Sequence, residues 1–128
     1  MTRVVKFRGQ DANGFWHYGY FSKDFLGTCY ITTLDGVDTS IVIESTLGQF
    51  TGLFDKNLNE VYEGDLLKRV ISFAGSHSEF TEKVIFYHAC FSTINVSDKD
   101  DAPLYLSNYV GHTIEVIGNI HESEVQDA

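Results

Sequence analysis

The side chains best suited to chemistry in this sequence are five histidines and two cysteines. The histidines are His17, His77, His88, His112 and His121. None of them forms the HxH or HExxH spacing with which a strand or helix presents two zinc ligands, and a zinc site needs three or four converging ligands. We therefore predict no metal site. We interpret His17 and His88, which lie in apolar segments, as ordinary sheet residues.

Nucleophilic catalysis has one candidate pair, His88 and Cys90. The two residues are two positions apart, so on a strand they would share a face and a thiol–imidazole contact would be within reach. No basic cluster or helix start lies beside Cys90 to activate its thiol. The sequence also lacks the GxSxG, GxGxxG and GxxxxGKS/T patterns of hydrolases and phosphate-binding loops. We therefore predict no catalytic residue and no cofactor.

The charge balance limits the classes of partner. The chain has 128 residues, with 18 acidic and 9 basic side chains and a net charge of −9. Such a surface repels phosphate at long range, so we do not expect nucleic acid as a direct ligand. A basic partner, or mimicry of the charge of a nucleic acid, remains compatible with it. The sequence shows no signal peptide and no spanning apolar run, so we expect a cytoplasmic protein without a membrane partner, with Cys29 and Cys90 reduced.

An aromatic stripe runs through the segment FWHYGYF at residues 15–21. Trp16, Tyr18 and Tyr20 alternate there and would share one face of a strand. Stacking of single-stranded bases requires Lys and Arg beside such a stripe, and few are near in sequence. Those few are Arg3, Lys6 and Arg8. We interpret the stripe as a core or subunit interface and expect self-association through it, because a sheet with aromatic and apolar faces is too apolar for a small domain to bury alone.

The elements that would position these residues are mainly strands. Alternation of apolar and polar residues predicts strands at 3–8, 15–21, 29–34, 40–44, 66–73, 83–96 and 113–120. Turns are expected at 11–14, 35–38 and 55–59, and a loop at 74–79. The 83–96 segment is either one bent strand or two strands with a break near residues 88–89. In the strand at 66–73, Arg69 falls on the apolar face.

One short helix is expected near residues 102–110. Asp101 is placed as its N-cap, Pro103 lies in its first turn and Gly111 follows its end. The chain is expected to form a single compact domain over 1–128, with subdomains at 1–45, of N-terminal antiparallel hairpins, and 46–121. The tail at 122–128 is expected to be flexible.

Two glycine-containing segments are the most distinctive motifs, GQFTGLFDKNLNEVYEGDLLK at 48–68 and IEVIGNIHES at 114–123. Their glycines permit tight backbone approaches, and Asp65 can close the turn made by Glu63 and Gly64. We expect these motifs to be structural, with a contact surface as the second possibility. The residues concerned are Gly48, Gln49, Phe50, Thr51, Gly52, Leu53, Asp55, Tyr62, Glu63, Gly64, Asp65, Glu115, Val116, Ile117, Gly118 and Asn119.

These two motifs, in this order and after the opening VKFRGQDANGFWHYGYF at 5–21, resemble the YopX family of phage and prophage proteins. Leu58-Asn59 departs from the pattern, because relatives carry a glycine turn there. The resemblance implies an SH3-type small β-barrel for the C-terminal part. It also implies a viral or mobile-element protein of unknown biochemical role, with no established catalytic residues to transfer.

The prediction that follows is a non-catalytic phage or prophage accessory protein in the cytoplasm of a bacterial host. It would bind a host or phage protein through sheet edges and barrel loops, and would form a homo-oligomer. The first alternative is an acidic mimic of nucleic acid or a regulator associated with nucleic acid. The second is a small hydrolase built on His88 and Cys90.

Overall fold

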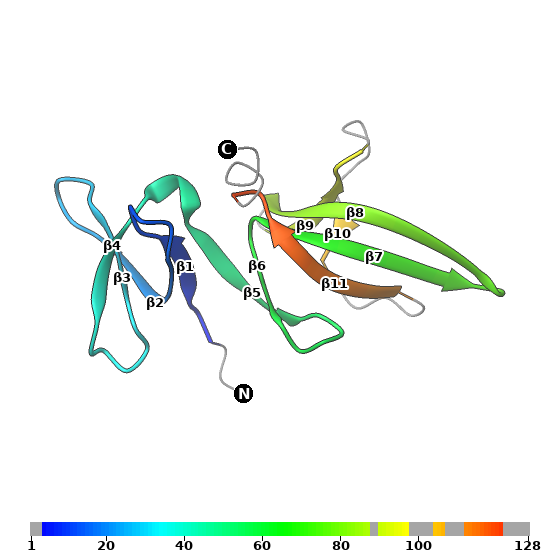
Figure 1. Cartoon of the computed structure of the whole chain (residues 1–128), viewed down its shortest axis with the longest axis horizontal. Helices are drawn as coiled ribbons and strands as arrows, with labels where there is room; N and C mark the ends of the chain where they lie inside the picture. Colours follow the sequence, from blue (N-terminus) through cyan, green and yellow to red (C-terminus); the bar gives the residue numbers. More distant parts are fainter. Residues whose placement is uncertain (1–3, 88–89, 98–103, 107–111, 122–128) are drawn as a thin grey trace. The chain divides into compact units, whose positions relative to one another are not determined.

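The computed structural model describes residues 4–87, 90–97, 104–106 and 112–121, and its chain forms two compact units, Met1–Gly52 and Leu53–Ala128 (Figure 1). Strands make up 63% of it and helix 3%, which confirms the predicted mainly β fold. All described strand pairs are antiparallel. The expected single domain over 1–128 stays a prediction.

The first unit holds a twisted sheet in the strand order β4-β3-β2-β1-β5. Its elements are β1 (Phe7–Gln10), β2 (Trp16–Lys23), β3 (Cys29–Thr32), β4 (Thr39–Val42), the single 3₁₀ turn η1 (Glu44–Thr46) and β5 (Gly48–Phe54), whose last residues enter the second unit. The predicted strands at 15–21, 29–34 and 40–44 are thus confirmed. The strand expected at 3–8 begins only at Phe7.

One face of this sheet forms the core of the first unit. Cys29, Ile31 and Val42 are buried there, and Phe7, Phe21 and Leu47 pack against them. Gly19 lets β2 and β3 approach closely, because a Cβ atom at this position would lie 2.0 Å from the carbonyl oxygen of Thr32. No other residue type fits that crossing, so the glycine is a requirement of the sheet.

The second unit holds a sheet in the strand order β10-β9-β8-β7-β11. The strands of the unit are β6 (Glu60–Tyr62), which is hydrogen-bonded to β5 and lies outside this sheet, followed by β7 (Asp65–Phe73), β8 (Ser76–Tyr87), β9 (Cys90–Asn95), β10 (Leu104–Tyr105) and β11 (His112–Asn119). Val61, Leu67, Val84 and Ile114 form the buried core, and Leu106 and Val116 pack against it. The alternation that predicted strands at 66–73 and 113–120 is confirmed.

Two expectations for this unit change, and one open alternative is decided. The helix predicted near 102–110 is wrong where the structure describes the segment, because Leu104 and Tyr105 pair with Thr93 and Ser92 of β9. Residues 98–103 and 107–111 lie outside the described residues. The loop expected at 74–79 is a tight turn, with β8 already starting at Ser76. The 83–96 segment is two strands that pair with each other, as one of its two predicted alternatives had it.

The described strands of 46–121 do not form a closed barrel, and the SH3-type barrel stays a prediction. Among the described residues, no helix has both the length and the apolar character needed to cross a membrane.

Candidate functional site

Three turns among the described residues share one architecture, and each begins with an aspartate, at Asp11, Asp24 or Asp55. The aspartate Oδ1 accepts the N–H groups of the residues two and four positions later, at 2.8–3.0 Å. The aspartate carbonyl accepts the N–H of the residue three positions later, which has a positive φ in every case. Those third residues are Gly14, Gly27 and Leu58. The pattern is a hairpin turn held by a side chain that substitutes for a backbone acceptor.

The second carboxylate oxygen of each aspartate binds a different partner. Oδ2 of Asp11 lies 2.8 Å from His17 Nε2, and Oδ2 of Asp24 accepts the Tyr30 hydroxyl at 2.9 Å. The hydrogen bond from His17 holds the pKa of Asp11 below its usual value, and the hydrogen bond from Tyr30 does the same for the pKa of Asp24. These carboxylates are therefore ionised acceptors at neutral pH, which suits them to fixing turns rather than to transferring protons.

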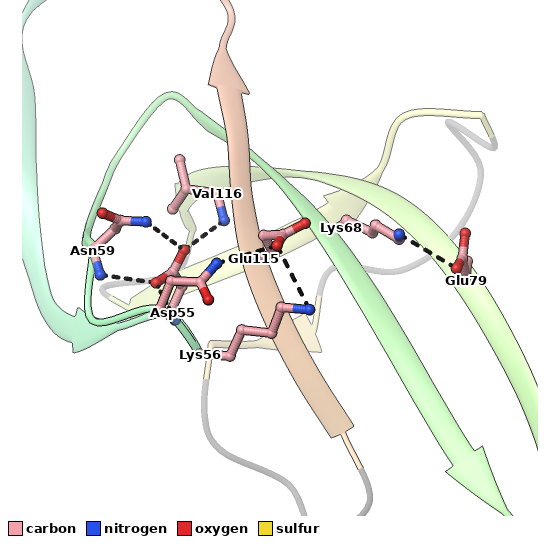
Figure 2. Close-up of polar contacts among 8 residues, drawn as sticks. Asp55, Lys56, Asn59, Lys68, Glu79, Glu115 and Val116 are labelled. Carbon is pink, nitrogen blue, oxygen red and sulfur yellow. Dashed lines mark hydrogen bonds and ion pairs between the residues drawn. The ribbon is translucent and has the colours of Figure 1, made fainter.

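Asp55 joins the two family-like motifs of the second unit (Figure 2). Its Oδ2 accepts the backbone N–H of Val116 at 2.9 Å and the side-chain amide of Asn59 at 3.2 Å. The Lys56 N–H donates to the carbonyl of Ile114 at 3.0 Å. The turn at 55–59 is thereby fastened to β11, although the two segments are far apart in sequence.

Glu115 strengthens the same junction from the β11 side. Its Oε2 accepts the Asn57 amide at 3.2 Å and lies 3.6 Å from the Lys56 ammonium (Figure 2). Ile117, next along β11, is 50% exposed, and the register shifts between Val116 and Gly118. The bulge turns the Ile117 side chain outward. In this motif Glu115 therefore contacts the 55–59 turn, while Ile117 faces solvent.

The remaining motif residues of this unit also serve the backbone. The carboxylate of Asp65 is buried and accepts the Tyr62 N–H at 2.7 Å, which closes the turn through Glu63 and Gly64. Gly64 has φ +92°, donates its N–H to the carbonyl of Val84 and accepts the N–H of Ile120. Asn119 pairs with Asp65 and is buried. At each of these positions the motif residue takes part in a backbone hydrogen bond or a strand pair, which gives the expected structural role a physical explanation.

The first part of the motif lies on β5 in the first unit. Gly48 and Gln49 pair with Arg8 and Phe7 of β1. Phe50 is buried and carries the Lys6 ammonium 5.1 Å above its ring. The motif continues through Thr51, Gly52 and Leu53, where Gly52 has φ +87°. Nothing in these contacts tests whether the segment also binds a partner.

The predicted aromatic stripe lies on the sheet face opposite the core of the first unit. Tyr18 is 47% and Tyr20 53% exposed, whereas the residues between and after them, Gly19 and Phe21, face the core side. Trp16 is half-buried, with the Arg8 guanidinium 4.7 Å from its ring centroid. The strand register brings further residues to this face: Tyr30 pairs with Ile41, which is 62% exposed, and with Ser22. We call this set, Tyr18, Tyr20, Tyr30 and Ile41, the aromatic face.

A buried ion pair in the second unit was not predicted as such. Arg69 Nε donates to Glu82 Oε1 at 2.6 Å, and the two side chains are 1% and 7% exposed. Arg69 Nη1 also lies 3.3 Å from His112 Nδ1. The signal was present, because Arg69 stood on the apolar face of its strand, but the partner is set by cross-strand register. The pair is deep in the sheet, where charges need a partner to be tolerated.

The candidate catalytic and metal residues are not brought together where the structure describes them. Within those residues no group of three or more His, Cys, Asp or Glu side chains could hold a metal ion. His77 Nδ1 lies 2.7 Å from Ser72 Oγ on an exposed hairpin. Cys29 is a buried thiol and Cys90 an exposed one. His88 lies outside the described residues, so the His88–Cys90 hypothesis stays a prediction.

Comparison with known proteins places these observations in a family. No curated protein matches the chain. The family model described as "YopX protein" matches residues 8–125, which include the three aspartate turns and both motifs joined by Asp55. Since that match spans nearly the whole sequence, the chain belongs to the YopX family.

Proposed function

We propose that this YopX-family chain is a non-catalytic protein-interaction module of phage or prophage origin that acts in the cytoplasm of a bacterial host. It associates with itself through the aromatic face and binds a host or phage protein. The observation that carries the proposal is the exposure of that face: two tyrosines of β2, Tyr18 and Tyr20, and an isoleucine of β4, Ile41, are each about half exposed or more, on the two strands that flank β3.

Several features of the face favour a protein as its ligand. Its opposite side already packs on the core of the first unit, so these side chains add nothing to that core. Tyrosine is enriched at protein interfaces, because its ring buries apolar area while its hydroxyl keeps a hydrogen bond. Trp16, which is half-buried on the same strand as Tyr18 and Tyr20, is another aromatic residue type common in interfaces.

The unit that bears the face is close to neutral. Residues 1–52 contain four basic and five acidic side chains, a balance of −1, whereas residues 53–128 contain five and thirteen, a balance of −8. Two copies of the first unit can therefore meet without strong charge repulsion. The same balance gives base stacking little electrostatic support, because binding of single strands relies on a basic groove.

Size-exclusion chromatography with light scattering tests the self-association. We expect a dimer or larger species at high micromolar concentration. A Tyr18→Thr/Tyr20→Thr variant, which keeps residues suited to strands, should run as a monomer. Leu58→Asn, which removes an 81% exposed leucine from the 55–59 turn of the other unit, is the matched control and should run like the unchanged chain.

The partner is tested by affinity purification from the bacterium that carries the gene, with the unchanged chain and both variants as bait. A protein that the unchanged chain and Leu58→Asn retain, and that Tyr18→Thr/Tyr20→Thr loses, supports the proposal. An unchanged chain that is monomeric at high micromolar concentration would contradict the self-association. Identical protein recovery with all three baits would contradict a role for the aromatic face.

A further inference from the structure

The turn at 24–28 exposes two large apolar side chains at its tip. Phe25 is 95% and Leu26 77% exposed, the largest exposed fractions among the apolar residues of the described first unit. They occupy the two central positions of a turn, where polar or small residues are usual. A phenylalanine with its whole ring in water is unfavourable by itself, since burial of such a side chain removes a large apolar surface from water.

This tip is held rigidly by the aspartate framework. Gly27 N–H donates to the Asp24 carbonyl, and Asp24 N–H donates to the carbonyl of Thr28, both at 3.0 Å. The carboxylate of Asp24 accepts the N–H of Leu26 at 3.0 Å and that of Thr28 at 2.9 Å, and the Tyr30 hydroxyl fixes it from the strand. The two apolar side chains therefore project from an ordered backbone, which reduces the entropy lost on binding.

The other two aspartate turns provide an internal comparison. With the same hydrogen bonds, their central residues are Ala12-Asn13 and Lys56-Asn57. The framework thus forms with small and polar residues at both positions. Phe25 and Leu26 are not required by the turn, and the core of the first unit does not include them. Their presence calls for an explanation outside the fold.

We infer that Phe25 and Leu26 form a docking anchor that enters an apolar pocket on a positively charged partner protein. The inference rests on the proposed interaction function and adds a second surface to it, distinct from the aromatic face. A rigid aromatic or aliphatic side chain that fills a pocket is the usual centre of a binding hot spot. The two residues together supply such a centre on a single turn.

Charge selects the class of partner. The chain as a whole carries −9, so long-range attraction favours a basic protein as the occupant. The same charge disfavours an anionic membrane surface, for which apolar loop tips are usually flanked by lysines or arginines. The one lysine next to this turn, Lys23, is already paired with Glu44 at 3.1 Å.

The test variant is given by the chain itself. Phe25→Ala/Leu26→Asn changes the turn to Asp-Ala-Asn-Gly, the sequence that forms the same turn at residues 11–14, so the fold should be retained. Leu58→Asn is the matched control, because it removes an exposed apolar residue from the third turn of the same design. Circular dichroism and Trp16 fluorescence would verify that both variants are folded.

The experiment places the photo-crosslinking residue p-benzoylphenylalanine at position 25, or at position 20 for comparison, in the full chain inside the bacterium that carries the gene. Adducts are identified by mass spectrometry, and the crosslinked protein is then purified for affinity measurements. We expect position 25 to crosslink to a protein of net positive charge. That protein should bind Phe25→Ala/Leu26→Asn at least ~30-fold more weakly than the unchanged chain, and Leu58→Asn within about twofold.

Other outcomes would overturn the inference. These are the absence of an adduct at position 25, an adduct at that position with the chain itself and with no other protein, a partner of net negative charge, or equal affinity for the unchanged chain and the double variant. Binding to vesicles of phosphatidylethanolamine and phosphatidylglycerol that the double variant abolishes would identify a membrane anchor instead. A protein adduct at position 20 without one at position 25 would overturn the anchor alone and leave the proposed function intact.

Discussion

Replacement of Asp55 by alanine is expected to destabilise the second unit strongly. The carboxylate is 4% exposed and accepts four hydrogen bonds, from the backbone of Asn57, Asn59 and Val116 and from the side chain of Asn59. Alanine would leave three backbone N–H groups without their acceptor, in a place where water enters poorly. The turn at 55–59 and β11 would also lose the bond that joins them.

The size of the effect follows from the number of bonds. A hydrogen bond to a charged group contributes about 1.5–3 kcal/mol, but neighbouring bonds are not additive, so we expect about 3–5 kcal/mol in total. Asp55→Asn should cost less, about 1.5–3 kcal/mol. Its oxygen can still accept the N–H groups of Asn57 and Asn59, while its amide nitrogen would face the N–H of Val116, a donor against a donor.

Urea unfolding followed by circular dichroism measures the loss of stability, and amide hydrogen exchange of Val116 locates it. The fluorescence of Trp16, the only tryptophan, reports the first unit separately. Asp38→Asn is the matched control, because Asp38 is an exposed carboxylate in a turn of the first unit. It should change the free energy of unfolding by no more than about 0.5 kcal/mol.

Acid should remove the difference between the unchanged chain and Asp55→Asn. Burial alone would raise the pKa of Asp55, but the hydrogen bonds from Val116, Asn59 and Asn57 outweigh it and lower the pKa below its usual 3.8. A lowered pKa in the folded state gives stability that is fully present above the unfolded-state pKa and is lost as pH falls through the folded-state pKa. The difference between the two proteins should therefore begin to shrink below about pH 4 and disappear only once the pH lies below the folded-state pKa of Asp55.

Two results would refute this reasoning. The first is an Asp55→Ala variant that unfolds within about 0.5 kcal/mol of the unchanged chain, with the Val116 amide still protected from exchange. The second is a stability difference for Asp55→Asn that is the same at pH 7 and in acid. Either would mean that the carboxylate does not fasten the turn to β11.

The other predictions concern different links in the fold. Gly19→Ala should destabilise the first unit by about 3 kcal/mol or more, because the new Cβ would lie 2.0 Å from the Thr32 oxygen; thermal unfolding followed by tryptophan fluorescence would show it. Arg69→Met should cost about 3–5 kcal/mol in urea, and Arg69→Met/Glu82→Met should recover most of it, because only the single variant leaves an unpaired buried charge. Leu58→Asn should stabilise by about 1 kcal/mol and raise the melting temperature, since Leu58 has φ +66° and asparagine tolerates that conformation better.

The strands could be predicted because their signal is local. Alternation of apolar and polar side chains at 15–21, 29–34 and 113–120 follows from one face packing on a core, and it survives in the structure. The helix signals near Asp101 and Pro103 were equally local. At Leu104 and Tyr105 they were outweighed by pairing with β9, which local sequence does not encode.

The turns show where a usable signal was missed. Asp11 and Asp55 were placed in predicted turns, but the turn at 24–28 was not predicted, because its centre is Phe-Leu and not Asn-Gly. Both Asp11 and Asp24 are followed by glycine three positions later, and that Asp-x-x-Gly spacing carries the physical requirement: a carboxylate acceptor at the start and a positive φ at the fourth residue. The two central residues meet no requirement of the turn, so their identity does not predict it.

Part of the acidic composition of the chain serves its turns and its buried ion pair. Five of its carboxylates accept hydrogen bonds that hold the fold: Asp11, Asp24, Asp55, Asp65 and Glu82. Four of these accept backbone N–H groups at turns, and Glu82 balances a buried arginine. A mimic of nucleic acid needs carboxylates free to form a solvated row, and residues fixed by turn geometry cannot be placed for that purpose. The requirement of the fold for aspartate turns thus accounts for part of the acidic composition without a nucleic-acid-like surface.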